Sequence, residues 1–119
     1  MTVKLFESEL KVMDLLWKEG DMPAKEIALR LKEQIGWSKT TTYTVVKKCV
    51  EKQAVSRMDP GFICRPLISR EEVQRAETKD LIDRMYGGSE DLLIASLIGN
   101  KEMDPDRIAR LKKMIEDLK

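Results

Sequence analysis

The stretch that decides the fold is WSKTTTYTVVKKCVEK, residues Trp37 to Lys52. It combines hydroxyl side chains and lysines with valines and a cysteine. Threonine and valine favour β-strands, so composition alone does not say whether the stretch is a strand or a helix. Its spacing does, because a helix turns about 100° per residue whereas a strand alternates every second residue.

A helical projection separates the stretch into two faces. One face collects Thr40, Tyr43, Thr44, Lys47, Lys48 and Glu51. The opposite face collects Thr42, Val45, Val46, Cys49 and Gln53. A strand would mix the two sets, so the pattern predicts a helix, with Ser38 as its N-cap.

Two helices are expected before this stretch and a β-hairpin after it. The first runs from Glu7 to Lys18, with Ser8 as a possible N-cap, and the second from Pro23 to near Gly36. The runs AVSRM and FICRPLI flank an Asp-Pro-Gly turn, which is typical of a hairpin. A short strand near Met22 could pair with this hairpin.

Three more helices are expected in the rest of the chain. Ser69 to Glu72 form a capping box before a helix that reaches about Tyr86. Ser89 caps the next helix, and Asp104-Pro105 opens a last one with Ile108, Leu111, Ile115 and Leu118 on one stripe. The expected fold is mainly α with a small β-hairpin: a winged helix-turn-helix domain at 1–69 and a helical dimerisation domain at 70–119.

Charge and composition narrow the function classes. Residues 1–69 carry 12 Lys+Arg against 9 Asp+Glu, net +3, and residues 70–119 carry 10 against 12, net −2. A basic first part joined to an acidic second part fits a domain that faces nucleic acid. The 119 residues include two cysteines and no histidine, so a four-ligand zinc site within one chain is not expected, nor any cofactor.

No targeting or membrane segment is expected. The start, MTVKLFESEL, lacks the continuous apolar stretch of a signal peptide, and no run approaches the length of a membrane span. A cytoplasmic protein with reduced thiols is the expectation. On the apolar face of the third helix, Cys49 is either core filler or a redox sensor, and burial is the commoner role of a free cysteine.

Three helices followed by a hairpin is the winged helix-turn-helix plan, in which the third helix enters the DNA major groove. Hydroxyls and lysines can bond to base edges and phosphates, while the valine face anchors the helix on the fold. The alternative is a solvated surface helix that binds nothing. The order of the surrounding elements favours the DNA interpretation.

Five motifs in order carry a family resemblance: ELKVMDLLW, PAKEIALRL, WSKTTTYTVVKKCVEK, PLISREE and YGGS. With them the chain resembles the penicillinase-repressor (BlaI/MecI) family of bacterial transcription regulators, which includes copper-responsive CopY-type repressors. The resemblance implies a homodimer that represses transcription from a palindromic operator in double-stranded DNA. The implied DNA contacts, including two arginines of the wing at 54–65, are Lys39, Thr40, Thr41, Tyr43, Thr44, Lys47, Lys48, Arg57 and Arg65.

The chain departs from the family pattern in several places. Lys52-Gln53 stands where relatives have Lys-Gly, so the left-handed turn that glycine eases could be built differently here. The wing loop is short and acidic, and an aromatic usual in the return strand is replaced around Cys64. Antibiotic-responsive members are cleaved at an Asn-Phe bond after a membrane sensor protease acts. Ser96-Leu97 occupies the aligned position, so that induction is not expected.

The apolar run LLIASLI, residues 92–98, predicts a dimer. A helix that is apolar on nearly every side needs cover on both sides, and a second subunit can provide it. The alternative is a small monomeric bundle in which the neighbouring helices cover it. The residues expected at the dimer interface are Leu92, Leu93, Ile94, Leu97, Ile98, Ile108, Leu111 and Ile115.

An enzyme is not expected, because the chain has no histidine, no Gly-rich phosphate loop and no G-x-S-x-G motif. The main rival is a protein-interaction adaptor that uses the winged fold without DNA. Salt dependence separates the two, since DNA binding through lysines weakens steeply as salt rises.

Overall fold

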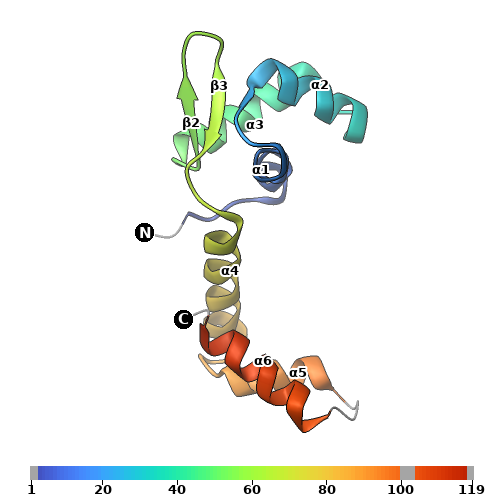
Figure 1. Ribbon diagram of the computed structural model, residues 1–119, viewed down its shortest axis with the longest axis vertical. Coiled ribbons are helices and arrows are strands. Elements are labelled where there is room, and N and C mark those ends of the chain that lie inside the picture. Colours follow the sequence, from blue (N-terminus) through green and yellow to red (C-terminus); the bar gives the residue numbers. More distant parts are fainter. Residues whose placement is uncertain (1–2, 100–103, 118–119) are drawn as a thin grey trace. The chain divides into compact units, whose positions relative to one another are not determined.

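The computed structural model of the protein describes residues 3–99 and 104–117. The elements follow the expected order of three helices, a hairpin and three helices, with one short extra strand (Figure 1). They are α1 (Glu7–Glu19), β1 (Met22–Pro23), α2 (Ala24–Ile35), α3 (Lys39–Glu51), β2 (Val55–Met58), β3 (Ile63–Pro66), α4 (Arg70–Met85), α5 (Glu90–Ile98) and α6 (Pro105–Asp117). The chain forms two compact units, Met1–Val73 and Gln74–Lys119.

The three strands form one antiparallel sheet in the order β1-β3-β2. Val55 pairs with Pro66 and Met58 with Ile63, while Met22 of β1 pairs with Cys64 on the other edge of β3. The expected hairpin and the short strand near Met22 are therefore both confirmed. Pro23 lies in an edge strand, where its missing N–H costs no ladder hydrogen bond.

Most helix starts agree with the sequence. Ser38 Oγ accepts a hydrogen bond from Thr41 N at 3.1 Å, and Ser89 Oγ accepts one from Leu92 N at 3.3 Å. The capping box at α4 is complete, because Ser69 Oγ accepts from Glu72 N while the Glu72 carboxylate accepts from Ser69 N.

Two helix starts were predicted wrongly. Pro23 is the N-cap of α2 rather than its first helical residue. Ser8 lies inside α1, whose N-cap is Phe6. At that end the Glu9 carboxylate accepts the Phe6 N–H at 2.7 Å, so an acidic side chain three residues on satisfies the orphan donor.

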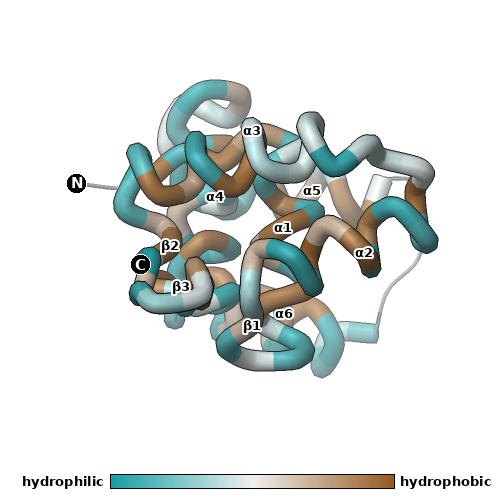
Figure 2. Tube along the Cα trace, turned by 90° about the horizontal axis from the view of Figure 1, so that it is seen from above, coloured by the Kyte–Doolittle hydropathy of each residue, from teal (hydrophilic) through white to brown (hydrophobic). Residues whose placement is uncertain are grey.

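The core of the first unit lies between α1, α2, α3 and the sheet. Brown and teal alternate along α2 in Figure 2, as expected for a helix with one face on a core. The fully buried side chains include Val12, Met13, Leu16, Ile27, Val46, Cys49, Val55 and Cys64. Trp17 packs at the edge of this core and donates from Nε1 to the Ile68 carbonyl at 2.9 Å.

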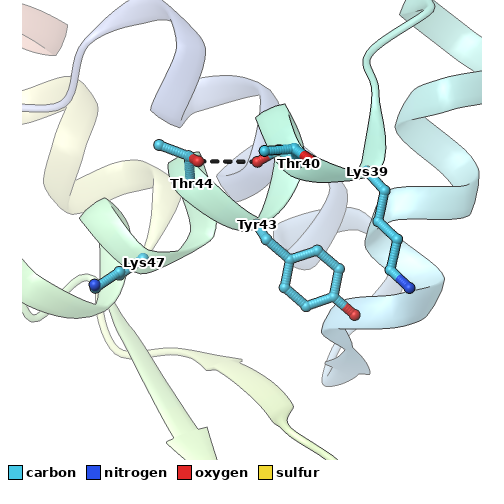
Figure 3. A pocket seen from close by; sticks show the side chains of 5 residues that line it. All are labelled: Lys39, Thr40, Tyr43, Thr44 and Lys47. Carbon is cyan, nitrogen blue, oxygen red and sulfur yellow. Dashed lines mark hydrogen bonds between the residues drawn. The ribbon is translucent and has the colours of Figure 1, made fainter.

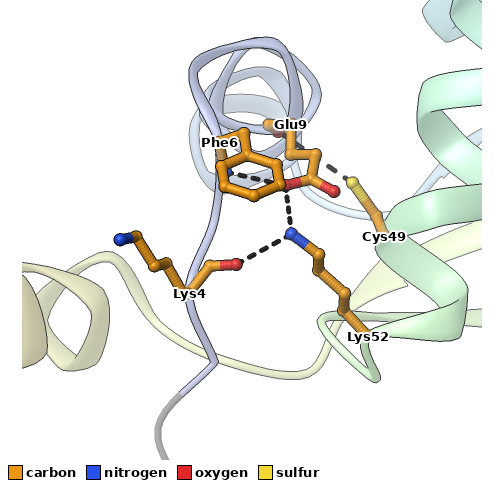
Figure 4. Close-up of polar contacts among 5 residues, drawn as sticks. All are labelled: Lys4, Phe6, Glu9, Cys49 and Lys52. Atoms are coloured by element: carbon orange, nitrogen blue, oxygen red, sulfur yellow. Dashed lines mark hydrogen bonds and ion pairs between the residues drawn. The ribbon is translucent and has the colours of Figure 1, made fainter.

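A partly buried ion pair joins α1 to the end of α3 (Figure 4). Glu9 is fully buried, and its Oε1 lies 2.6 Å from Lys52 Nζ. Lys52 also donates to the Lys4 carbonyl at 2.9 Å, and its Nζ lies 4.0 Å from the centroid of the Phe6 ring. Three groups of the N-terminal segment 4–9 therefore surround the ammonium of a residue that lies more than 40 positions further along the chain.

The second unit has a small core of its own, formed by Ile82, Leu93, Ile94 and Ile115, with Tyr86 and Ile98 packed against it. Ile108 and Leu111 of α6 are half-buried. Leu118, expected on the same stripe, lies outside the described residues. The intrachain core covers only part of α5, because Leu92 and Leu97 remain 56% and 62% exposed.

Candidate nucleic-acid interface

Helix α3 buries one face in the core and exposes the other to solvent, as the sequence predicts. Its buried residues are Thr42, Val45, Val46 and Cys49, which pack in the core with α1 and α2. Thr40, Thr44, Lys47 and Lys48 are exposed, and Tyr43 is half-buried. The assignment of Gln53 to the inner face was wrong: the helix ends at Glu51, and Gln53 is exposed in the turn that follows.

The exposed face of α3 forms a continuous shallow hollow (Figure 3). Its lining comes from Lys39, Thr40, Tyr43, Thr44 and Lys47. The aromatic ring thus lies between an ammonium at the start of the helix and another two turns later. Such a surface offers positive charge for phosphates, hydroxyls for base edges and methyl groups for thymine.

The hydroxyl groups on this face are already partly engaged. Thr44 Oγ1 donates to the Thr40 carbonyl at 2.9 Å, so its oxygen is left to accept a hydrogen bond. Thr41 Oγ1 lies 2.9 Å from Ser38 Oγ within the N-cap. A base edge would therefore meet Thr44 mainly as an acceptor and a methyl group, while Thr41 belongs to the cap of the helix.

The two wing arginines each have an acidic partner. Arg57 Nε lies 3.2 Å from an Asp59 carboxylate oxygen, and Arg65 Nε lies 2.9 Å from Asp21 Oδ2. All four side chains are substantially exposed, so these pairs are weak and can open. A phosphate reaching either arginine would have to compete with a carboxylate.

Phe62 was not among the residues that the sequence predicted for the DNA-binding surface. Its ring makes an edge-to-face contact with Tyr43 of α3, with ring centroids 6.0 Å apart and planes at 78°. It also packs against the Arg57 guanidinium. The sequence shows that Phe62 follows the Pro60-Gly61 turn. It does not show the contact with Tyr43, which forms only when the hairpin packs on α3.

Both thiols lie behind this face in the core. Burial, reinforced by the charge of Glu9, raises the pKa of Cys49 to about 12. Burial raises the pKa of Cys64 to about 11, against the opposing effect of Arg57. Thiols held so firmly in the neutral form are poor nucleophiles at neutral pH.

Comparison with known proteins adds an independent observation. The family model described as penicillinase repressor matches residues 5–117, nearly the whole chain. The chain belongs to the penicillinase repressor family. That family comprises transcriptional repressors and is not an enzyme class.

Relatives within the family are distant in sequence but similar in length. The methicillin resistance regulatory protein MecI of Staphylococcus aureus strain N315 is 21% identical over 116 residues, covering 96% of this chain and 94% of that protein. A penicillinase repressor of Staphylococcus aureus is 20% identical over 118 residues, covering 98% and 94%.

A solved structure supports the fold of the first unit. The solution structure of the DNA binding domain of the repressor BlaI matches with a TM-score of 0.56 and 24% identity, covering 60% of this chain and 90% of that domain. The expected winged helix-turn-helix is thereby confirmed as the fold.

Other kinds of site find no support in the described ranges. Residues 3–99 and 104–117 hold no cluster of three or more histidine, cysteine, aspartate or glutamate side chains that could bind a metal ion. None of the helices within those ranges has both the length and the hydrophobicity to cross a bilayer.

Proposed function

We propose that the chain is a sequence-specific, DNA-binding transcriptional repressor that binds a palindromic operator as a homodimer. Membership of the penicillinase repressor family and the winged-helix fold of the first unit support the repressor role. In this proposal Lys39, Tyr43, Thr44 and Lys47 meet the major groove, and the wing lies against the backbone. Catalysis plays no part in it, and the protein acts in the cytoplasm.

The observation that carries this proposal is the division of α3 into two faces. Its apolar side is buried in the core, so Thr40, Thr44 and Lys47 are exposed on the side that can meet a partner. A major groove about 12 Å wide admits one helix with its side chains. Among the residues that the structure describes, the lining of the hollow holds two lysines and no acidic residue, which suits a polyanion.

Two substitutions on α3 separate the roles of charge and hydroxyl. With a duplex that the wild-type chain enriches from a random-sequence pool, Lys47→Ala should flatten the salt dependence of binding, by about one unit of log–log slope for each phosphate that the lysine neutralises. Thr44→Ala should instead reduce the difference in binding free energy between the enriched duplex and a scrambled one. The reduction should be about 1–3 kcal/mol if Thr44 bonds well to a base edge. Fluorescence anisotropy at several salt concentrations measures both.

Lys11→Ala is the matched control, because Lys11 is an exposed lysine on α1 rather than α3. It should leave the slope and the preference unchanged. Wild-type protein that enriches no duplex, or α3 variants indistinguishable from Lys11→Ala, would favour the protein-interaction adaptor instead.

The dimer is proposed from the second unit. Leu92, Leu97 and Met114 are 56%, 62% and 63% exposed there, although the same helices also supply that unit's core. A second copy would remove this apolar surface from water. A twofold dimer would present its recognition helices to half-sites roughly 34 Å apart, one turn of DNA.

Release from DNA by a sensor protease is not part of the proposal. Ser96 and Leu97 stand at the position aligned with the Asn-Phe bond of antibiotic-responsive members, within α5. Ser96 Oγ lies 3.1 Å from Tyr86 Oη, a hydrogen bond within the second unit.

A further inference from the structure

Phe62 is held in a backbone conformation that is unusual for its residue type. Its φ is +50°, in the left-handed region that a bulky side chain seldom adopts. Its carbonyl accepts the Ala24 N–H, the first of α2, at 2.9 Å. Strained conformations of this kind persist where surrounding contacts over-determine them, and they cluster at functional sites.

The ring of Phe62 belongs to a row of four side chains, in which it lies between Arg57 and Tyr43. The guanidinium carbon of Arg57 lies 3.8 Å from the Phe62 centroid, and the Tyr43 ring meets Phe62 edge to face at 6.0 Å. Lys39 Nζ in turn lies 5.8 Å from the Tyr43 centroid. We call these residues, Arg57, Phe62, Tyr43 and Lys39, the aromatic row.

The aromatic row links two elements of the surface, the wing and the third helix. Arg57 belongs to β2, and Tyr43 and Lys39 belong to α3. Three of the four members are among the residues proposed to contact DNA, and Phe62 is the member that touches both the wing and the helix. Aromatic pairs and cations over rings favour particular geometries, so the row restricts where each charge can lie.

We propose that Phe62 is a positioning residue for DNA binding, which fixes Tyr43 on α3 and Arg57 on the wing as one preorganised surface. This inference rests on the proposed function, since the surface has a purpose only if the chain binds DNA. Phe62 itself need not touch DNA. Its contribution lies in the order it imposes before binding, which lowers the entropy cost of association.

The test compares Phe62→Leu and Phe62→Tyr with the wild-type chain on the duplex enriched from a random pool. Leucine keeps apolar bulk but removes the ring, whereas tyrosine restores it. Phe6→Leu is the matched control: Phe6 also lies under a cation, Lys52, but at the start of α1. Thermal unfolding and the NMR shifts of the Tyr43 ring are recorded for each folded variant without DNA.

Phe62→Leu should lose about 3- to 10-fold in affinity for that duplex and shift the Tyr43 ring resonances, while Phe62→Tyr and Phe6→Leu bind within about twofold of wild type. In a Tyr43→Leu background the Phe62→Leu change should reduce the affinity for the duplex much less, because the ring through which Phe62 acts on DNA binding is already absent. If Phe62→Leu does not fold, Phe62→Met makes the same comparison.

The inference fails if wild type enriches a duplex and folded Phe62→Leu binds it equally well. It also fails if the effects of Phe62→Leu and Tyr43→Leu on affinity simply multiply. A wild-type chain that enriches no duplex would instead overturn the proposed function, and this inference with it.

Discussion

At the scale of single residues, Gln53 shows how a departure from a sequence pattern is accommodated. The family resemblance implies glycine after the lysine, and the sequence left open whether the turn is built differently here. The structure keeps the left-handed turn: Gln53 has φ +62° and its N–H donates to the Val50 carbonyl at 3.0 Å. The side chain therefore bears a strain that glycine would not.

Gln53→Gly should consequently stabilise the protein, by about 0.5–1 kcal/mol, since relief of the left-handed strain exceeds the added freedom of the unfolded chain. Urea unfolding followed by circular dichroism measures the change. Gln34→Gly is the control with opposite sign, because Gln34 lies within α2. Glycine there should destabilise by up to about 1 kcal/mol, and equal effects at both positions would contradict the strain.

The two thiols yield a prediction about pH. Their folded pKa values, about 12 for Cys49 and about 11 for Cys64, lie above the value of 9.0 for an ordinary thiol. Well below pH 9 the thiols are protonated in both the folded and the unfolded chain, so the stability that their burial in the neutral form contributes is fully present. As pH rises from about 9 toward 12, the unfolded chain gives up thiol protons first, so the free energy of unfolding should fall.

Labelling with a thiol reagent checks this at the same positions. At pH 8 the native chain should react far more slowly than the chain in denaturant. The single variants Cys49→Ser and Cys64→Ser show which thiol accounts for each labelling rate of the native chain. Rapid labelling of the native protein would contradict the burial and reopen a redox role for Cys49.

At the scale of elements, the Glu9–Lys52 pair connects the end of α3 to the start of α1. Glu9→Ala should destabilise the first unit by about 3 kcal/mol, because the Phe6 N–H loses its acceptor and the Lys52 ammonium loses its anionic partner, keeping the Lys4 carbonyl as an acceptor. Because the Lys52 side chain is 28% exposed, water can solvate its ammonium in the variant and offset part of this loss of stability. Chemical denaturation measures it.

Glu19→Ala provides the comparison for that change. Glu19 also pairs with a cation, Arg30 at 3.5 Å, but both side chains are more than a third exposed. Its removal should cost no more than about 0.5 kcal/mol. Similar costs for the two variants would mean that the Glu9 pair has no special place in docking α3.

At the scale of the whole molecule, the second unit is expected to join two copies. Leu92→Gln with Leu97→Gln should convert a dimer into a monomer, as seen by analytical ultracentrifugation. Operator affinity should then fall about 100-fold or more, because two linked sites become one. Leu29→Gln with Leu67→Gln is the matched control, since these first-unit leucines are 56% and 52% exposed. A dimer that survives the first pair but not the second would place the interface elsewhere.

Much of the fold followed from local patterns. Hydrophobic spacing and capping residues act within a few positions of each other, so the three helices before the hairpin, the hairpin itself and the start of α4 could be predicted. The outward face of α3 followed from the same helical period. The starts of α1 and α2 were not predicted correctly: Phe6 rather than Ser8 is the N-cap of α1, and Pro23 is the N-cap of α2 rather than its first helical residue.

What the sequence by itself determined is therefore the identity and order of the elements and the face that α3 buries. Only the tertiary structure decided that Glu9 meets Lys52, that Asp21 and Asp59 engage the wing arginines, and that Phe62 meets Tyr43. The physical reason is distance along the chain. Capping and periodicity are local, whereas most of these contacts join residues brought together only when α1, α3 and the hairpin pack on a shared core.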